Sequence, residues 1–203
     1  MIKKLMVLFY VSFILSCAAQ DTKNFQSELG INGVIPESWV HINKKVLEEI
    51  CNEKTNPTGK KIPEKAISNI KDFIEKNGLE IIYCFPIKEH EFNDNITLIT
   101  STDDYPDGSK SWKKSFEATY SKNLGEKIQI EDLKTFTTSS LHIVYTEYTL
   151  KKHGIRNRIF WLKTENDKII IINMIFSEKT YQEKLPIAEE FIKSIKNRSG
   201  SSR

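Results

Sequence analysis

Four histidines, three cysteines and a scatter of carboxylates are the side chains of this sequence best suited to chemistry. No two histidines stand at the i, i+4 spacing that a metal site on a helix uses. His41 and His142 fall in predicted strands and could meet across a sheet, although lone strand histidines are more often solvated or hydrogen-bonded. The histidines therefore predict no metal site.

Between residues 103 and 108 an acidic turn offers oxygen atoms of the kind that calcium prefers. Its spacing does not fit, because Tyr105 and Lys114 stand where the ion would need an acid or amide and a bidentate glutamate. There is no Gly-x-Ser-x-Gly elbow, no cysteine beside a histidine and no glycine-rich phosphate loop. We accordingly predict no catalytic residue, no bound metal and no cofactor.

A basic cluster surrounds a predicted hairpin tip and consists of Lys151, Lys152, His153, Arg156 and Arg158. One interpretation is a contact patch for an anionic partner, either a lipid head group or an acidic protein. The other, which we favour, is a solvated turn that discourages pairing at a sheet edge.

The first sixteen residues have the three-part plan of a secretory signal. Lys3 and Lys4 precede an apolar run from Leu5 to Leu15, and the run ends at small residues. Because a membrane-spanning helix needs about 20 apolar residues, the run is too short to be an anchor. Residues 1–16 are therefore predicted to be a signal peptide.

Two cleavage sites compete at the end of the signal. Leu15-Ser16-Cys17 resembles a bacterial lipoprotein box, which predicts a lipid on Cys17 and attachment to a membrane of the cell envelope. Alternatively, Ala19 ends an ordinary cleavage site and leaves Gln20 as the first residue of a soluble periplasmic or secreted protein. We favour the lipoprotein.

Cys51 and Cys84 are the remaining cysteines, and an exported protein can form a disulfide. A bridge between them would close a loop of about 34 residues and stabilise the fold by roughly 3–4 kcal/mol. Alternatively, Cys84 is a buried small hydrophobic residue within an apolar stretch. The sequence leaves both alternatives open.

Charge argues against nucleic acid as a partner. The chain has 30 basic and 27 acidic residues, and loss of the signal would remove two lysines and no acid. The mature chain would therefore be nearly neutral, without the clustered positive excess of a nucleic-acid-binding protein.

Apolar periodicity, capping residues and turn residues predict the order of the elements. The predicted helices span residues 43–52, 63–77, 111–124 and 186–197, and the predicted strands span residues 39–42, 79–85, 95–100, 135–150, 156–163 and 168–176. Ser111 is the expected N-cap of the third helix, and Pro186 is expected to open the last one. A flexible tether over residues 17–28 and a tail over residues 198–203 would flank one domain, residues 29–197.

Three short motifs suggest a family: Pro36 to Trp39, Phe85-Pro86 with Asn95 leading into a strand, and the sequence Glu190 to Lys196. With these motifs the chain resembles the PsbP-like superfamily, to which the exported DcrB-like lipoproteins belong. The helix predicted over residues 63–77 departs from that pattern. The resemblance implies an α/β (α+β) sandwich, a curved antiparallel sheet covered by helices, and it carries no catalytic residue across.

Two function classes follow from these observations. The favoured one is a non-catalytic exported lipoprotein, a binding or assembly module for an envelope protein or a small ligand, of which an immunity or inhibitor protein would be one form. The alternative is an exported hydrolase whose site is assembled from scattered polar residues.

Overall fold

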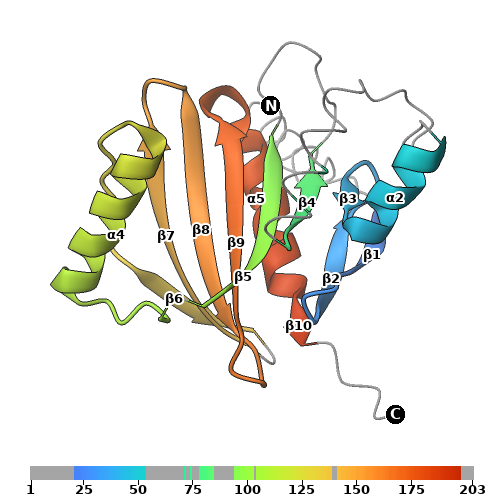
Figure 1. Cartoon of the computed structure of the whole chain (residues 1–203), viewed down its shortest axis with the longest axis horizontal. Helices are drawn as coiled ribbons and strands as arrows, with labels where there is room; N and C mark the ends of the chain where they lie inside the picture. Colours follow the sequence, from blue (N-terminus) through green and yellow to red (C-terminus); the bar gives the residue numbers. More distant parts are fainter. Residues whose placement is uncertain are drawn as a thin grey trace, which may run out of the picture.

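The computed structural model describes residues 21–53, 71, 74, 78–84, 94–102, 104–138 and 141–197 (Figure 1). Its elements in chain order are β1 (Thr22–Gln26), β2 (Ile31–Pro36), β3 (Val40–Ile42), α2 (Lys44–Glu53), β4 (Glu80–Tyr83), β5 (Asn95–Ser101), α4 (Lys110–Leu124), β6 (Lys134–Thr137), β7 (His142–Leu150), β8 (Ile155–Lys163), β9 (Ile169–Ser177), α5 (Glu178–Ser194) and β10 (Lys196–Asn197). The signal peptide, Cys17 and most of the helix predicted over residues 63–77 lie outside the described residues.

Two antiparallel sheets form the framework. Seven strands follow the order β3-β4-β5-β9-β8-β7-β6, and three more follow the order β1-β2-β10. Short turns join β7 to β8 and β8 to β9, which makes these strands neighbours, as the sequence predicts. The predicted α+β fold with an antiparallel sheet and covering helices is confirmed.

The seven-stranded sheet is covered on both faces. Alternate residues of β9 show this, because Ile170, Ile172 and Phe176 belong to the core beneath α5, whereas Ile169 and Ile171 pack in a separate cluster with α4. In Figure 1, α5 lies behind the central strands and α4 lies along β7. Within the described part of the chain, no helix is long and apolar enough to cross a membrane.

Helix α5 is longer than predicted and starts earlier. It begins at Glu178, because the side chain of Ser177 accepts a hydrogen bond from the Thr180 backbone N–H and caps the first turn. Pro186 therefore lies inside the helix, and the prediction that it opens the helix is wrong. The helix ends at Ser194, and the following residues pair with β2 as β10.

The N-terminal segment is also more ordered than the predicted tether. Thr22–Gln26 pairs with β2 along its whole length, and Phe25 is 2% exposed. The Phe25 ring meets the Phe191 ring of α5 edge-on, with centroids 5.4 Å apart. The prediction of a flexible tether up to residue 28 is thus wrong from Thr22 onward, since an apolar side chain anchors this strand to the core.

Two further boundaries differ from the prediction. The strand expected over residues 135–150 is two strands, β6 and β7, and the Thr138 N–H donates to the Leu141 carbonyl in the turn between them. Helix α4 is capped by Ser109 instead of Ser111, because the Ser109 hydroxyl accepts from the Trp112 N–H at 3.1 Å.

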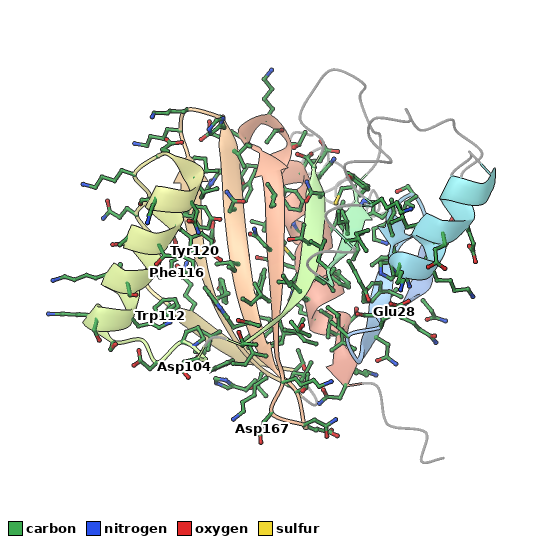
Figure 2. All side chains as sticks on the ribbon, viewed as in Figure 1. Glu28, Asp104, Trp112, Phe116, Tyr120 and Asp167 are labelled. Carbon is green, nitrogen blue, oxygen red and sulfur yellow. The ribbon has the colours of Figure 1, made fainter. Side chains whose placement is uncertain are left out.

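Aromatic side chains attach α4 to the sheet. Trp112, Phe116 and Tyr120 lie on the side of the helix that faces the strands (Figure 2), and each is partly buried. Phe116 stacks on Tyr120 with ring centroids 4.0 Å apart and meets Trp161 of β8 edge-on at 5.6 Å. Helix α4 has no fully buried residue.

Candidate functional site

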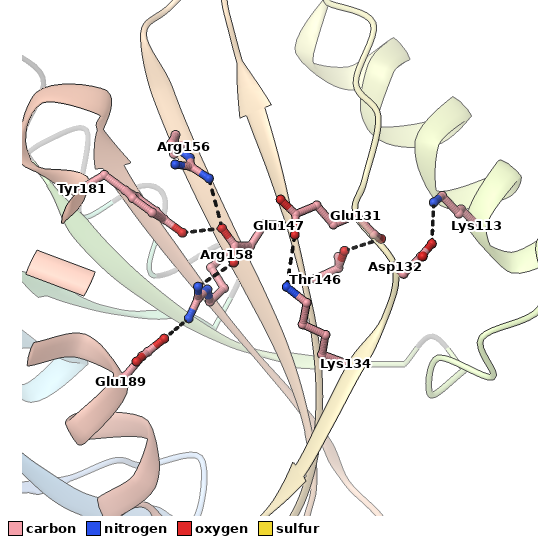
Figure 3. Close-up of polar contacts among 10 residues, drawn as sticks. All are labelled: Lys113, Glu131, Asp132, Lys134, Thr146, Glu147, Arg156, Arg158, Tyr181 and Glu189. Carbon is pink, nitrogen blue, oxygen red and sulfur yellow. Dashed lines mark hydrogen bonds and ion pairs between the residues drawn. The ribbon is translucent and has the colours of Figure 1, made fainter. Parts of the chain in front are cut away.

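The predicted basic patch divides into two parts. Lys151, Lys152 and His153 are exposed in the turn between β7 and β8, as the hairpin prediction requires. Arg156 is half-buried and Arg158 is buried, and both point away from the turn into an ion network beneath α5 (Figure 3). The five residues therefore do not form one exposed patch.

Glu147 of β7 is the centre of this network. It lies opposite Arg158 in the β7–β8 pairing and accepts a hydrogen bond from the Arg158 Nη2 at 2.5 Å. Arg156 donates to the same carboxylate at 3.4 Å, and the Tyr181 hydroxyl of α5 donates to it at 2.5 Å. Arg158 also pairs with Glu189. The network ties the strand hairpin to α5.

The network fixes protonation states. Burial alone would raise the pKa of Glu147, but the hydrogen bond from Tyr181 and the charges of Arg158 and Arg156 outweigh it and hold that pKa below its usual value. Burial, and then the hydrogen bond to Glu147, raise the pKa of Tyr181. Glu147 is therefore ionised and Tyr181 neutral around pH 7.

Next to this network lies a groove of about 790 Å³, between the outer edge of β7 and the segment that follows α4. Five basic side chains line it, Lys113, Lys127, Lys134, Lys151 and Arg156, together with three acidic ones, Glu131, Asp132 and Glu147. Glu131, Asp132 and Glu147 each pair with one of the basic groups. Within the described part of the chain, the ammonium groups of Lys127 and Lys151 have no acidic partner, so the groove carries excess positive charge.

The segment over residues 126–131 forms the far wall of the groove. Ile128 and Ile130 are buried in the cluster beneath α4, and their backbone N–H groups donate to side chains of that helix, Ser121 at 2.9 Å and Glu117 at 3.0 Å. The segment meets β7 where the Glu131 N–H donates to the Glu147 carbonyl at 2.9 Å. These bonds set the width of the groove.

Of the two cysteines that the sequence offers for a disulfide, Cys84 lies among the described residues. Cys84 follows β4 and is buried, and this burial raises the pKa of its thiol. The side chain of Cys51 lies outside the described residues, so a bridge between the two stays a prediction.

The histidines are not brought together. His41 is on β3 and His142 on β7, with four strands between them, so the idea that they meet across the sheet is wrong. His41 pairs with the buried Glu80 at 2.7 Å, and His142 lies 3.1 Å from the Tyr105 hydroxyl. Among the described residues no group of three His, Cys, Asp or Glu side chains could hold a metal ion.

Sequence reasoning missed Glu147, Tyr181 and Glu189. A signal for the first was present, because counting outward from the Leu150–Ile155 pair at the turn places Glu147 opposite Arg158. No sequence signal places Tyr181 or Glu189 there, since their positions depend on where α5 begins and how it packs.

The antiparallel sheet covered by helices defines the chain as a protein with a PsbP-like α+β fold. It is similar to the solution structure of cyanobacterial PsbP (CyanoP) from Synechocystis sp. PCC 6803, with a TM-score of 0.50 and 10% sequence identity. The match covers 90% of this chain and 95% of that one. No protein-family model and no curated protein sequence matches the chain.

Proposed function

We propose that the chain is an exported lipoprotein, held to a membrane of the cell envelope by a lipid on Cys17, that binds an anionic partner in the groove beside β7 without catalysing a reaction. An immunity or inhibitor protein would be one form of such a module. The observation that carries the proposal is the excess of positive charge in the groove, with Lys127 and Lys151 both lacking an acidic partner among the described residues.

The protonation states around the groove favour binding over hydrolysis. A hydrolase would need a general acid or base with a pKa near the working pH. Here the pKa of Glu147 is lowered, and burial raises the pKa of Tyr148 far above neutral pH. The hydrogen bond from Lys134 to Glu131 raises the pKa of that lysine. Glu147 and Lys134 therefore stay charged and Tyr148 stays neutral around pH 7, so none of the three is poised as a general acid or base.

Binding is tested with polyglutamate as the probe, by isothermal titration of the mature chain carrying Cys17→Ser. We expect saturable binding that weakens as salt is added, because salt screens exposed charges. The double variant Lys127→Glu, Lys151→Glu should lose it. The double variant Lys168→Glu, Lys179→Glu makes the same change of charge at exposed positions outside the groove, so it is the control and should bind as the parent does. Equal binding by all three proteins would contradict the proposed site.

The anchor is tested separately by mass spectrometry of the N-terminus of the protein made in a bacterial host with its own signal. A diacylated or triacylated Cys17 is expected. An unmodified chain that begins at Gln20 would overturn the anchor and leave an exported soluble protein.

A further inference from the structure

We infer that the groove takes an extended acidic peptide segment of a partner protein, which adds as a strand to the open edge of β7. This inference rests on the proposed function, because it specifies the chemistry of the anionic partner. It makes the peptide backbone, as well as the charge, part of the recognition.

The edge of β7 is open over its second half. β6 pairs with β7 only from His142 to Tyr145, and beyond Tyr145 no described strand lies on that side. Because the Glu147 carbonyl accepts from Glu131 on this side, strand alternation turns the N–H and carbonyl of Thr149 the same way, away from β8. Thr149 lines the groove, so its backbone groups face the space that a ligand would occupy.

The chain's own neighbouring segment leaves this edge open. The N–H groups of Ile128 and Ile130 donate to Ser121 and Glu117 of α4, and the hydrogen bonds that join this segment to the β7–β8 hairpin lie at the two ends of the groove. At one end the Glu131 N–H donates to Glu147, and at the other the Lys152 N–H donates to the Glu126 carboxylate at 3.1 Å. An unpaired edge of this kind is the surface to which an extended peptide adds.

Charge and length define the peptide. Lys134 lies opposite Tyr145 and Arg156 lies opposite Thr149, so both are on the face of the sheet that carries Glu147. Alternate side chains of an added strand lie on one face, so acidic residues at alternate positions would meet these cations. Beyond the Glu131–Glu147 bond the open edge runs from Tyr148 to Lys151, and a segment of about five residues spans it.

The test uses a capped pentapeptide of valines with glutamate at positions two and four. Two versions carry N-methyl groups on the odd or on the even residues, and a third has lysine in place of glutamate. N-methylation keeps the charge but removes backbone donors, so one of the two methylated versions should bind at least about tenfold more weakly than the parent. The lysine peptide should not bind.

A protein variant tests the same edge. Thr149→Pro removes the Thr149 N–H, which faces the groove, and leaves the β7–β8 bonds, and proline is tolerated at edge strands. This variant should no longer bind the pentapeptide, but it should still bind polyglutamate through Lys127 and Lys151. Thermal unfolding and circular dichroism report whether the variant is folded. If the variant is unfolded, the methylated peptides still test strand addition on the unmodified chain.

Equal binding of the parent and both methylated peptides would overturn strand addition while leaving the anion-binding groove intact. Binding of vesicles with anionic lipid but of no peptide would also overturn it. If the unmodified chain bound neither the pentapeptide nor polyglutamate, the proposed function itself would fail.

Discussion

The two faces of the seven-stranded sheet are covered by helices that are attached in different ways. Helix α5 buries Tyr181, Ala188, Phe191 and Ile192 completely, whereas α4 buries no residue completely and rests on a row of partly exposed rings. We conclude that the α5 face stabilises the fold. The α4 face supplies a wall of the groove, a position where some mobility is compatible with binding.

The largest effect is expected from Phe191→Ala on α5. The ring is 1% exposed and packs against Phe25, so its loss leaves a cavity in the main core and should cost about 3–5 kcal/mol of unfolding free energy. Urea denaturation measures it. An unchanged midpoint would show that α5 does not form the core.

Glu147→Gln should cost about 3 kcal/mol, because it leaves Arg158 buried without its main counter-charge. Glu190→Gln on the exposed side of α5 is the matched control and should change stability by less than about 1 kcal/mol. If Glu147→Gln lowered the free energy of unfolding as little as the control does, the Glu147 network would be solvated.

Acid titration separates Glu147 from other carboxylates. Its pKa is lower in the folded state, so the unfolded chain binds the proton first and the stabilisation is complete only above the unfolded value of about 4.3. The parent should lose stability relative to Glu147→Gln as the pH falls below about 4.3. Parallel stability curves for the two proteins would contradict the lowered pKa.

Phe116→Ala makes the same truncation on the α4 face. The ring is only partly buried but contacts Tyr120 and Trp161, so we expect a loss of about 1–2 kcal/mol, below that of Phe191→Ala. Urea denaturation followed by tryptophan fluorescence measures it. A loss equal to that at Phe191 would mean that both faces stabilise the fold equally.

The smallest effect concerns the start of α4. Ser109→Ala should cost about 1 kcal/mol, because it removes the acceptor for the Trp112 N–H, whereas Ser111→Ala lies inside the helix and should change stability by only a few tenths of that. Chemical denaturation of the two variants compares them. The reverse order would place the cap at Ser111, where the sequence alone predicts it.

Local patterns predicted most of the fold. Some features depend only on residues close together in the chain. These are the alternation of buried and partly buried residues in β9, the short turns around Gly154 and Asp167, and the apolar spacing of α4. The site was harder to predict, because Glu147 and Tyr181 meet only after α5 packs on the sheet. The predicted start of α5 at Pro186 was wrong, because the sequence does not distinguish a proline in the first turn of a helix from one inside it.

Binding of an acidic strand in the groove beside β7 can be followed residue by residue in an NMR titration. The ¹⁵N-labelled mature chain with Cys17→Ser is titrated with the pentapeptide. We expect saturable shift changes confined to residues 126–132 and 147–152, together with slowed amide exchange at Thr149 as its N–H becomes hydrogen-bonded. Shift changes centred on another surface, or unchanged amide exchange at Thr149 at saturation, would rule out strand addition to β7.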